Sequence, residues 1–161
     1  MSKVNLIYGT GDVLHTHINI NPFAENPDNK KIIRDDIINI DKHVDDAELS
    51  ELVAYDVLDY IPLTKAEDAI HNWVKKIRMG GKIVLGGTDL IEVCKSLADY
   101  RIDLGEANVL IHGEQSKPYL IKRVGFTCLG LCDYLQNKYA FKIIKKRVNN
   151  YKMVVEAERC Q

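Results

Sequence analysis

Two glycines and an amide side chain stand where the first two apolar segments of the chain end. Gly9 and Gly11 follow the apolar run at residues 4–7, and Asn21 follows the alternating stretch at residues 16–20. Because glycine has no side chain, such a turn lets the backbone come close to a bound ligand. In α/β proteins that bind nucleotides, a turn of this kind lies under the cofactor. The pattern therefore favours ligand binding at the end of the first strand.

A second group of reactive side chains accompanies the fourth apolar segment, residues 51–58. Asp56 and Tyr60 are the candidate catalytic residues, because ligands of open α/β sheets bind outside the carboxyl ends of the strands. A solvated surface group or a packed aromatic ring is the competing interpretation of each. His15 and His17 lie two residues apart, but zinc needs more ligands than two. The sequence therefore predicts no metal site.

The elements that would position these residues begin with four strands. Their apolar or alternating segments end at Gly, Pro or acidic residues, which is typical of short strands. Residues 26–30, rich in Asn, Asp and Pro, indicate a turn between the second and the third strand. The predicted strands span residues 3–9, 16–20, 31–36 and 51–58.

Helices follow the fourth strand. Thr64 and Glu67 form the S/T-x-x-E capping box before an amphipathic segment, and the pair Gly80-Gly81 ends that segment. Asp89 can cap the next helix. The predicted segments are a helix over residues 64–79, a strand over 82–87, a helix over 90–100 and a polar loop over 105–119.

The C-terminal part predicts one more helix, around residues 127–138, and a β-hairpin. Asn149 and Asn150 join two alternating segments, as expected for an antiparallel pair. The whole pattern indicates an α/β fold, a Rossmann-like three-layer sandwich with a mostly parallel seven-stranded sheet and a C-terminal antiparallel hairpin. Residues 1–161 are expected to form a single domain.

The composition is ordinary for a soluble globular chain, with 46% apolar and 28% charged residues. The net charge of -1 gives no general attraction to nucleic acid or to an acidic membrane. The N-terminus lacks the apolar run of a signal peptide, and no segment approaches the length of a membrane span. We therefore expect a cytoplasmic protein with four reduced cysteines. The sequence leaves the oligomeric state open, a homo-oligomer included.

The order of these motifs resembles the class I S-adenosylmethionine-dependent methyltransferases, most specifically a subgroup of compact members. The first strand of that subgroup, N-I-G-C-G, corresponds to "NLIYG" at residues 5–9, and its N-x-D corresponds to "NIN" at residues 19–21. Its L-E-H-I corresponds to "LDYI" at residues 58–61, and its P-D-L to "TDL" at residues 88–90. The likeness covers nearly the whole chain, although each motif alone is weak.

The resemblance implies a site for S-adenosylmethionine and methyl transfer to an unknown acceptor. It assigns Gly9 and Gly11 to the turn beneath the cofactor and Asn21 to the ribose. It assigns Asp36, with Ile37, to the adenine. An Asp capping a strand end at a turn is an equally good interpretation of Asp36.

Three residues depart from the family pattern. Ile7 replaces the first glycine of the turn, and Asn21 replaces the acid that normally accepts hydrogen bonds from the ribose hydroxyls. Tyr55, in the place that contacts the methionine end of the cofactor, is bulkier than the usual small polar residue. Losing a charge-assisted hydrogen bond costs roughly 1–2 kcal/mol, or about tenfold in affinity.

Three hypotheses follow. The chain is an S-adenosylmethionine-dependent methyltransferase with weakened cofactor binding, or a catalytically inactive protein of the same fold that serves as a binding or scaffold module. The third is a different doubly wound protein, which predicts that the sheet does not end in an antiparallel hairpin.

Overall fold

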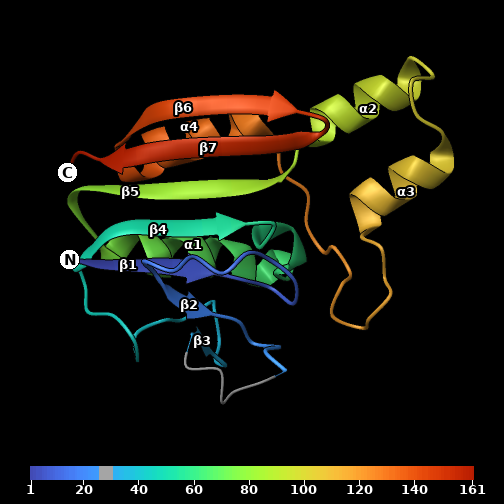
Figure 1. The fold of residues 1–161 in the computed structure, drawn as a ribbon. Coiled ribbons are helices and arrows are strands. Elements are labelled where there is room, and N and C mark those ends of the chain that lie inside the picture. The colour runs from blue at the N-terminus through green and yellow to red at the C-terminus, as the bar shows by residue number, and fades with distance from the viewer. Residues whose placement is uncertain (26–30) are drawn as a thin grey trace.

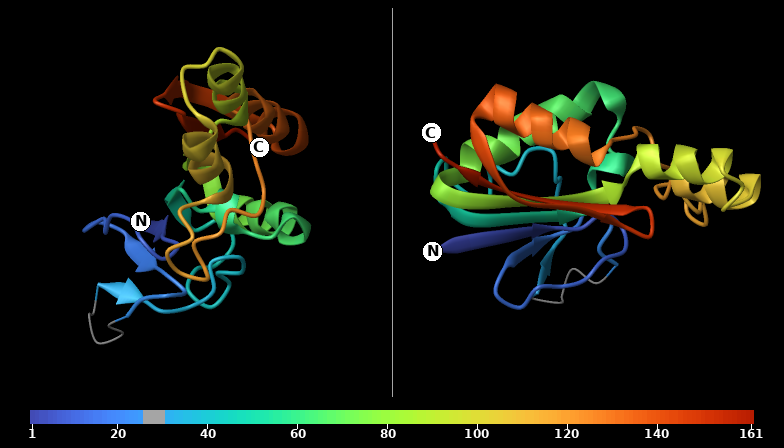
Figure 2. Two further views of the ribbon diagram at one scale, coloured as in Figure 1. Left: turned by 90° about the vertical axis from the view of Figure 1, so that its right-hand side faces the viewer. Right: turned by 90° about the horizontal axis from the view of Figure 1, so that it is seen from above.

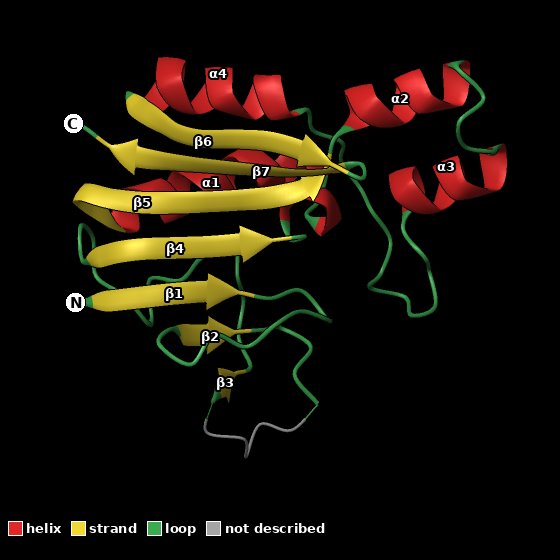
Figure 3. Cartoon of the chain, turned by 45° about the horizontal axis from the view of Figure 1, so that its top comes forward, coloured by secondary structure: helices red, strands yellow, loops and turns green. Residues whose placement is uncertain are grey.

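The computed structural model describes residues 1–25 and 31–161, so the turn expected at residues 26–30 lies outside the described residues. The described strands form one sheet in the order β3-β2-β1-β4-β5-β7-β6 (Figures 1 and 3). The strands are β1 (Ser2–Leu6), β2 (Ile18–Ile20), β3 (Ile32–Ile33), β4 (Leu49–Tyr55), β5 (Ile77–Thr88), β6 (Phe141–Asn149) and β7 (Lys152–Arg159).

The directions of the strands confirm the predicted mixed sheet. Strands β1 to β5 pair in parallel, whereas β7 is antiparallel to both β5 and β6. The hairpin turns at Asn150 and Tyr151, one residue later than predicted, because Asn149 still belongs to β6. Both turn residues have positive φ angles, as a tight hairpin turn requires. This closing hairpin excludes the third hypothesis.

Two helices, α1 (Leu63–Lys76) and α4 (Cys128–Tyr139), cover one face of the sheet. Helices α1 and α4 lie side by side on this helix-covered face, whereas α2 and α3 project beyond the carboxyl ends of the strands (Figure 2). The described helices are η1 (Leu58–Tyr60), α1 (Leu63–Lys76), α2 (Leu90–Ala98), α3 (Leu104–His112) and α4 (Cys128–Tyr139). None of them is long and apolar enough to cross a membrane.

The main core lies between the sheet and α1 with α4. Trp73 of α1 is fully buried, and its indole nitrogen donates a hydrogen bond of 2.6 Å to the carbonyl of Ile37. Leu52 of β4 and Leu85 of β5 point into the same core. Apolar side chains at every second position of these strands therefore make the helix-covered face.

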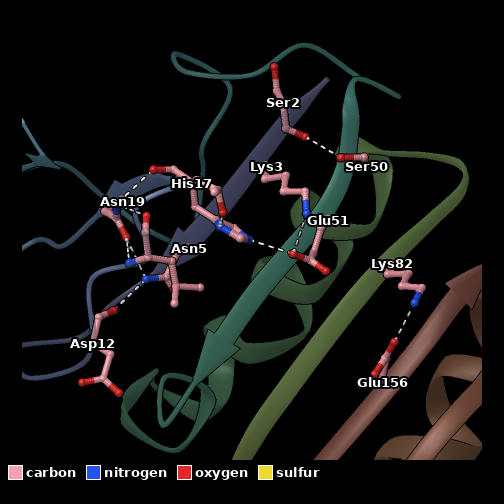
Figure 4. Close-up of polar contacts among 12 residues, drawn as sticks. Ser2, Lys3, Asn5, Asp12, His17, Asn19, Ser50, Glu51, Lys82 and Glu156 are labelled. Atoms are coloured by element: carbon pink, nitrogen blue, oxygen red, sulfur yellow. Dashed lines mark hydrogen bonds and ion pairs between the residues drawn. The ribbon is translucent and has the colours of Figure 1, made fainter.

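The opposite side of the sheet is the loop-covered face. The first loop, residues 7–17, packs over β1 and β2 on this face, and the described residues of the loop form no helix. Asn5 donates to the carbonyl of Asp12 at 2.8 Å, and the amide of Asn19 bonds both the N–H and the carbonyl of Leu14 at 3.0 Å (Figure 4). Buried asparagines thus satisfy the backbone of a loop whose described residues form no helix or strand, only an isolated bridge between Tyr8 and Thr10.

Ion pairs cover the remainder of the loop-covered face. Glu51 accepts from His17 at 2.8 Å and from Lys3 at 3.3 Å, and Lys82 pairs with Glu156 at 2.9 Å (Figure 4). Parallel sheets are usually apolar on both faces, because helices cover both. Here long charged side chains lie over the strands and let this face meet water.

Helix α1 differs from the prediction at both ends. It begins at Leu63 after Pro62 without a side-chain cap, so the capping box of Thr64 and Glu67 is wrong. The carbonyl of Pro62 already accepts the N–H of Ala66, and the carboxylate of Glu67 bonds the hydroxyl of Tyr134 instead.

A buried lysine is the last residue of α1. The ammonium of Lys76 lies 2.6 Å from Asp41 and 2.7 Å from Asp46, which holds the last turn, and β5 starts at the next residue. The predicted stop at Gly80-Gly81 is wrong, because both glycines lie inside β5, where Gly80 has a φ of +71° beside a break in the register.

The predicted polar loop over residues 105–119 is wrong for its first half, which forms α3. Asp103 accepts from the backbone N–H of Glu106 at 2.8 Å and caps this helix. Two other predictions are confirmed: Asp89 caps α2 by accepting from Glu92 at 3.0 Å, and α4 occupies the predicted segment.

Candidate functional site

Two adjoining hollows lie above the carboxyl ends of the parallel strands. The first, with a volume of about 440 Å³, is named the β2-side hollow. The second, with a volume of about 360 Å³, is named the β5-side hollow. Both are lined by Ile7, Thr10 and Gly11, so one wall, built by the start of the first loop, separates them.

The hollows bring together most of the residues singled out in the sequence. The β2-side hollow is lined by Gly9 and Asn21, with Phe23, Lys117 and Tyr119. The β5-side hollow is lined by Tyr55 and Asp56, with Gly86, Lys152 and Val154. The glycine turn, the end of β2 and the end of β4 therefore meet at one edge of the sheet, as expected for parallel strands.

The side chain of Asn21 is almost fully used by the backbone around it. Its Oδ1 accepts the N–H of Gly9 at 3.1 Å and the N–H of Phe23 at 3.0 Å, and its Nδ2 donates to the carbonyl of Gly9 at 3.1 Å. An amide oxygen has two lone pairs, so only the second N–H of Nδ2 is left for a ligand. Asn21 can donate one neutral hydrogen bond where an acid would accept two.

Ile7 and Gly11 compensate for each other in the shared wall. Ile7 is buried, and a Cβ built on Gly11 would lie 3.0 Å from its Cγ2. The glycine at 11 therefore makes the room that the isoleucine at 7 takes up.

An aromatic row begins at the glycine turn. Tyr119 stacks on Phe23 with ring centroids 4.1 Å apart, Phe23 meets Tyr8 edge-on at 4.9 Å, and Tyr8 stacks on Tyr60 at 5.3 Å. Sequence reasoning missed this row, because its members come from three separate loops and η1. The only signal in the sequence was that single aromatic residues, such as Phe23 and Tyr60, follow the ends of predicted strands.

Asp56 lies at the mouth of the β5-side hollow. Its carboxylate pairs with Lys152 at 2.6 Å, and both side chains are about half exposed. Its backbone has a φ of +51°, and its N–H donates to the carbonyl of Gly86 at 3.1 Å. Tyr55 beside it is 50% exposed and lies against Gly86, where a Cβ would be 2.7 Å from the ring.

Tyr60 lies outside both hollows. Burial, together with the nearby carboxylates of Asp56 and Asp59, raises the pKa of its hydroxyl above the usual range. The hydroxyl therefore stays protonated near neutral pH. Tyr60 is thus near Asp56, but only Asp56 lines the β5-side hollow.

A buried ion pair lies next to Tyr60. Asp59 and Lys122 lie 3.5 Å apart, and Lys122 also donates to the hydroxyl of Thr88 at 2.6 Å and to the carbonyl of Leu110 at 3.1 Å. Burial raises the pKa of Asp59 and lowers the pKa of Lys122. The pair joins η1, β5 and the chain after α3.

Asp36 and Ile37 are not brought to the hollows. Ile37 is a core residue whose carbonyl is held by Trp73, and Asp36 caps the following turn by accepting from Ile38 at 3.0 Å. The hydrogen bond to Trp73 draws this segment toward α1. Asp36 lines a separate hollow, in which Asp68 and other residues of α1 take part.

No group of three or more His, Cys, Asp or Glu that could hold a metal ion occurs in the part of the chain that the structure describes. The four cysteines are free thiols. Burial raises the pKa of Cys128 to about 11, so this thiol stays protonated.

Comparison with known sequences gives no relative for this chain. No family model matches it, and no curated protein matches it either.

Comparison with solved structures, in contrast, finds many similar folds. A possible histamine N-methyltransferase of Thermotoga maritima superposes with a TM-score of 0.65 at 13% identity, over 97% of this chain and 82% of that one. A 1,6-didemethyltoxoflavin-N1-methyltransferase of Burkholderia thailandensis, with S-adenosylhomocysteine bound, gives 0.62 at 7% identity, over 99% and 72%. An S-adenosylmethionine-dependent methyltransferase of Methanosarcina mazei gives 0.56 at 16%, over 81% and 67%. At such identities the likeness establishes the fold.

Proposed function

We propose that this chain, which has the fold of the class I S-adenosylmethionine-dependent methyltransferases, binds S-adenosylmethionine across its two hollows and transfers the methyl group to an acceptor. The observation that carries the proposal is the pair of hollows with one shared wall at the ends of β1, β2, β4 and β5. A ligand with an adenosine at one end and an amino acid at the other suits two adjoining spaces. The acceptor and a cytoplasmic location stay predictions.

The residues that line the two hollows fit this ligand, and we expect them to bind it with reduced affinity. Gly9, Asn21 and Phe23 would hold the adenosine in the β2-side hollow, and Tyr55 with Gly86 would receive the methionine end in the β5-side hollow. Asn21 offers one N–H to the ribose, so affinity about tenfold below that of a family member with the acid is expected.

Methyl transfer from this cofactor requires few reactive groups from the protein itself. When bound, the cofactor supplies an electrophilic methyl group, and alignment of the acceptor is the protein's main contribution. Asp56 is the side chain at the mouth that can accept a proton from the acceptor once its ion pair with Lys152 opens. Tyr55 narrows this mouth and positions the acceptor.

Isothermal calorimetry with S-adenosylmethionine and S-adenosylhomocysteine tests the binding step. The informative variant is Thr10→Phe, because Thr10 is exposed and lines both hollows. The matched control is Thr16→Phe, since Thr16 is exposed on the same loop and lines neither hollow. We expect dissociation constants in the micromolar range for the wild type and for Thr16→Phe, and binding weakened by about tenfold or more in Thr10→Phe.

A catalytically inactive binding module is the second candidate function, favoured by one observation. The oxygen of Asn21 already accepts two backbone hydrogen bonds, so its hydrogen-bonding capacity is satisfied without a ligand. This alternative predicts a melting temperature unmoved by millimolar cofactor. A ligand at a hundred times its dissociation constant would instead stabilise the fold by about 2.7 kcal/mol. An unmoved melting temperature together with silent calorimetry would overturn our proposal.

A further inference from the structure

The segment between α3 and α4, residues 113–127, crosses above the carboxyl ends of the strands and is named the crossing loop. Its C-terminal half is anchored firmly. The backbone N–H of Arg123 donates to the carbonyl of Asp59 at 2.7 Å, and the ammonium of Lys122 is buried against Thr88 and Asp59. These contacts tie the base of the crossing loop to η1 and β5.

The tip of the crossing loop lies on the glycine turn. A Cβ built on Gly9 would be 2.6 Å from Cε2 of Tyr119 and 3.3 Å from Cδ2 of Leu120. The space that glycine leaves in this turn, which in a nucleotide-binding fold serves the close approach of a ligand, is thus filled by the ring of Tyr119. The same ring stacks on Phe23 at an interplanar angle of 7°.

The tip is held more lightly than the base. Its ion pair, Lys117 with Glu25 at 3.0 Å, joins side chains that are 47% and 80% exposed, and such pairs contribute little to stability. Its backbone makes a local turn, in which Leu120 donates to the carbonyl of Lys117 at 2.9 Å. The N–H of Gln115 donates to the carbonyl of Leu120 at 3.2 Å, and its side chain donates to the carbonyl of His112 at 3.3 Å. These bonds hold the start of the tip within the crossing loop and the end of α3, so residues 116–119 are the part that can move away from Gly9 while the anchor at Arg123 stays in place.

We propose that Tyr119 is the residue that determines which ligands reach the glycine turn. This inference rests on the proposed function and adds a contact for which the sequence resemblance provides no counterpart. In the structure the ring of Tyr119 excludes a ligand from Gly9. A ligand enters only when its own contacts with Phe23 and the turn offset the lost stacking of Tyr119.

The test compares the affinity for S-adenosylhomocysteine of the wild type with that of Tyr119→Ala, measured by calorimetry. Removing the ring opens the space beside Gly9, where Leu120 remains, and frees the face of Phe23, so we expect binding tighter by about three- to tenfold. Tyr119→Phe keeps the ring and should bind like the wild type. Tyr100→Ala is the matched control, because Tyr100 is 94% exposed and lines neither hollow.

The outcomes separate this inference from the proposed function. Tighter binding by Tyr119→Ala supports the inference, and binding by that variant alone also supports it while showing that the wild type is closed. Equal or weaker binding by Tyr119→Ala, with a binding wild type, overturns the inference and leaves the proposed function standing. Absence of binding in both proteins overturns both. Melting temperatures of all four proteins identify any variant that fails to fold.

Discussion

The two faces of the sheet are built in different ways. On the helix-covered face, apolar side chains of the strands pack against α1 and α4 around the buried Trp73. On the loop-covered face, amide side chains and ion pairs fasten a loop, with Asn19 at its centre. Dispersion and apolar burial act over a whole surface, whereas hydrogen bonds act at points. The first face therefore supplies most of the stability, and the second allows the openings in which a ligand fits.

A substitution that disrupts the packing of the helix-covered face should lower the free energy of unfolding the most. Trp73→Ala removes a fully buried ring and its hydrogen bond to Ile37, so we expect the free energy of unfolding to fall by about 3–5 kcal/mol. Urea denaturation measures this change. A loss below about 1 kcal/mol would mean that the core tolerates a cavity there, contrary to the comparison.

Breaking the loop-covered face should cost less. In Asn19→Ala, both polar groups of Leu14 and the amide of Asn5 lose a partner, and we expect a loss of about 1–3 kcal/mol. Hydrogen exchange should accelerate in the first loop and not in α1. Asn108→Ala, at an exposed site of α3, is the control for the same chemical change and should leave both measurements as they are.

Asn21→Asp tests whether the loop-covered face gives up stability for ligand binding. We expect this variant to be less stable but to bind the ligand more tightly. The carboxylate keeps the hydrogen bonds from Gly9 and Phe23 but places an oxygen against the carbonyl of Gly9, where the amide donated. We expect the free energy of unfolding to fall by about 1–2 kcal/mol. Binding of S-adenosylhomocysteine should tighten by about tenfold, since the acid can accept from the ribose. Loss of stability without tighter binding would mean that Asn21 serves only to close the loop.

The smallest effect is expected where the loop-covered face meets water. Lys82 and Glu156 form a pair at 2.9 Å whose lysine side chain is 42% exposed. Lys82→Gln should therefore change the free energy of unfolding by about 0.2–1 kcal/mol, and the change should disappear in 1 M salt. A larger, salt-independent loss would show that ion pairs stabilise this face as much as packing stabilises the other.

The elements predicted well are those with local causes. Asp89 caps α2 through a neighbour three residues away, and Asn150 makes a hairpin turn with its own backbone. The end of α1 was predicted wrongly, because Ile77 already pairs with the distant Leu49 of β4, and Asp41 and Asp46 hold Lys76 as the last helical residue. The site was predicted in part. The ends of the parallel strands converge on one edge of the sheet, as predicted. Asp36 instead lies beside α1, because Trp73 holds the neighbouring Ile37 there.

The amino-acid sequence by itself determined the alternation of strands and helices, the closing hairpin and the set of strand ends at which a ligand fits. Each depends on periodicity and on turn residues within a few positions of one another. The tertiary structure alone decided that Asn21 is engaged by the backbone and that Tyr119 fills the space beside Gly9. Those contacts depend on where separate loops meet above the sheet, and the paths of loops follow from packing across the whole chain.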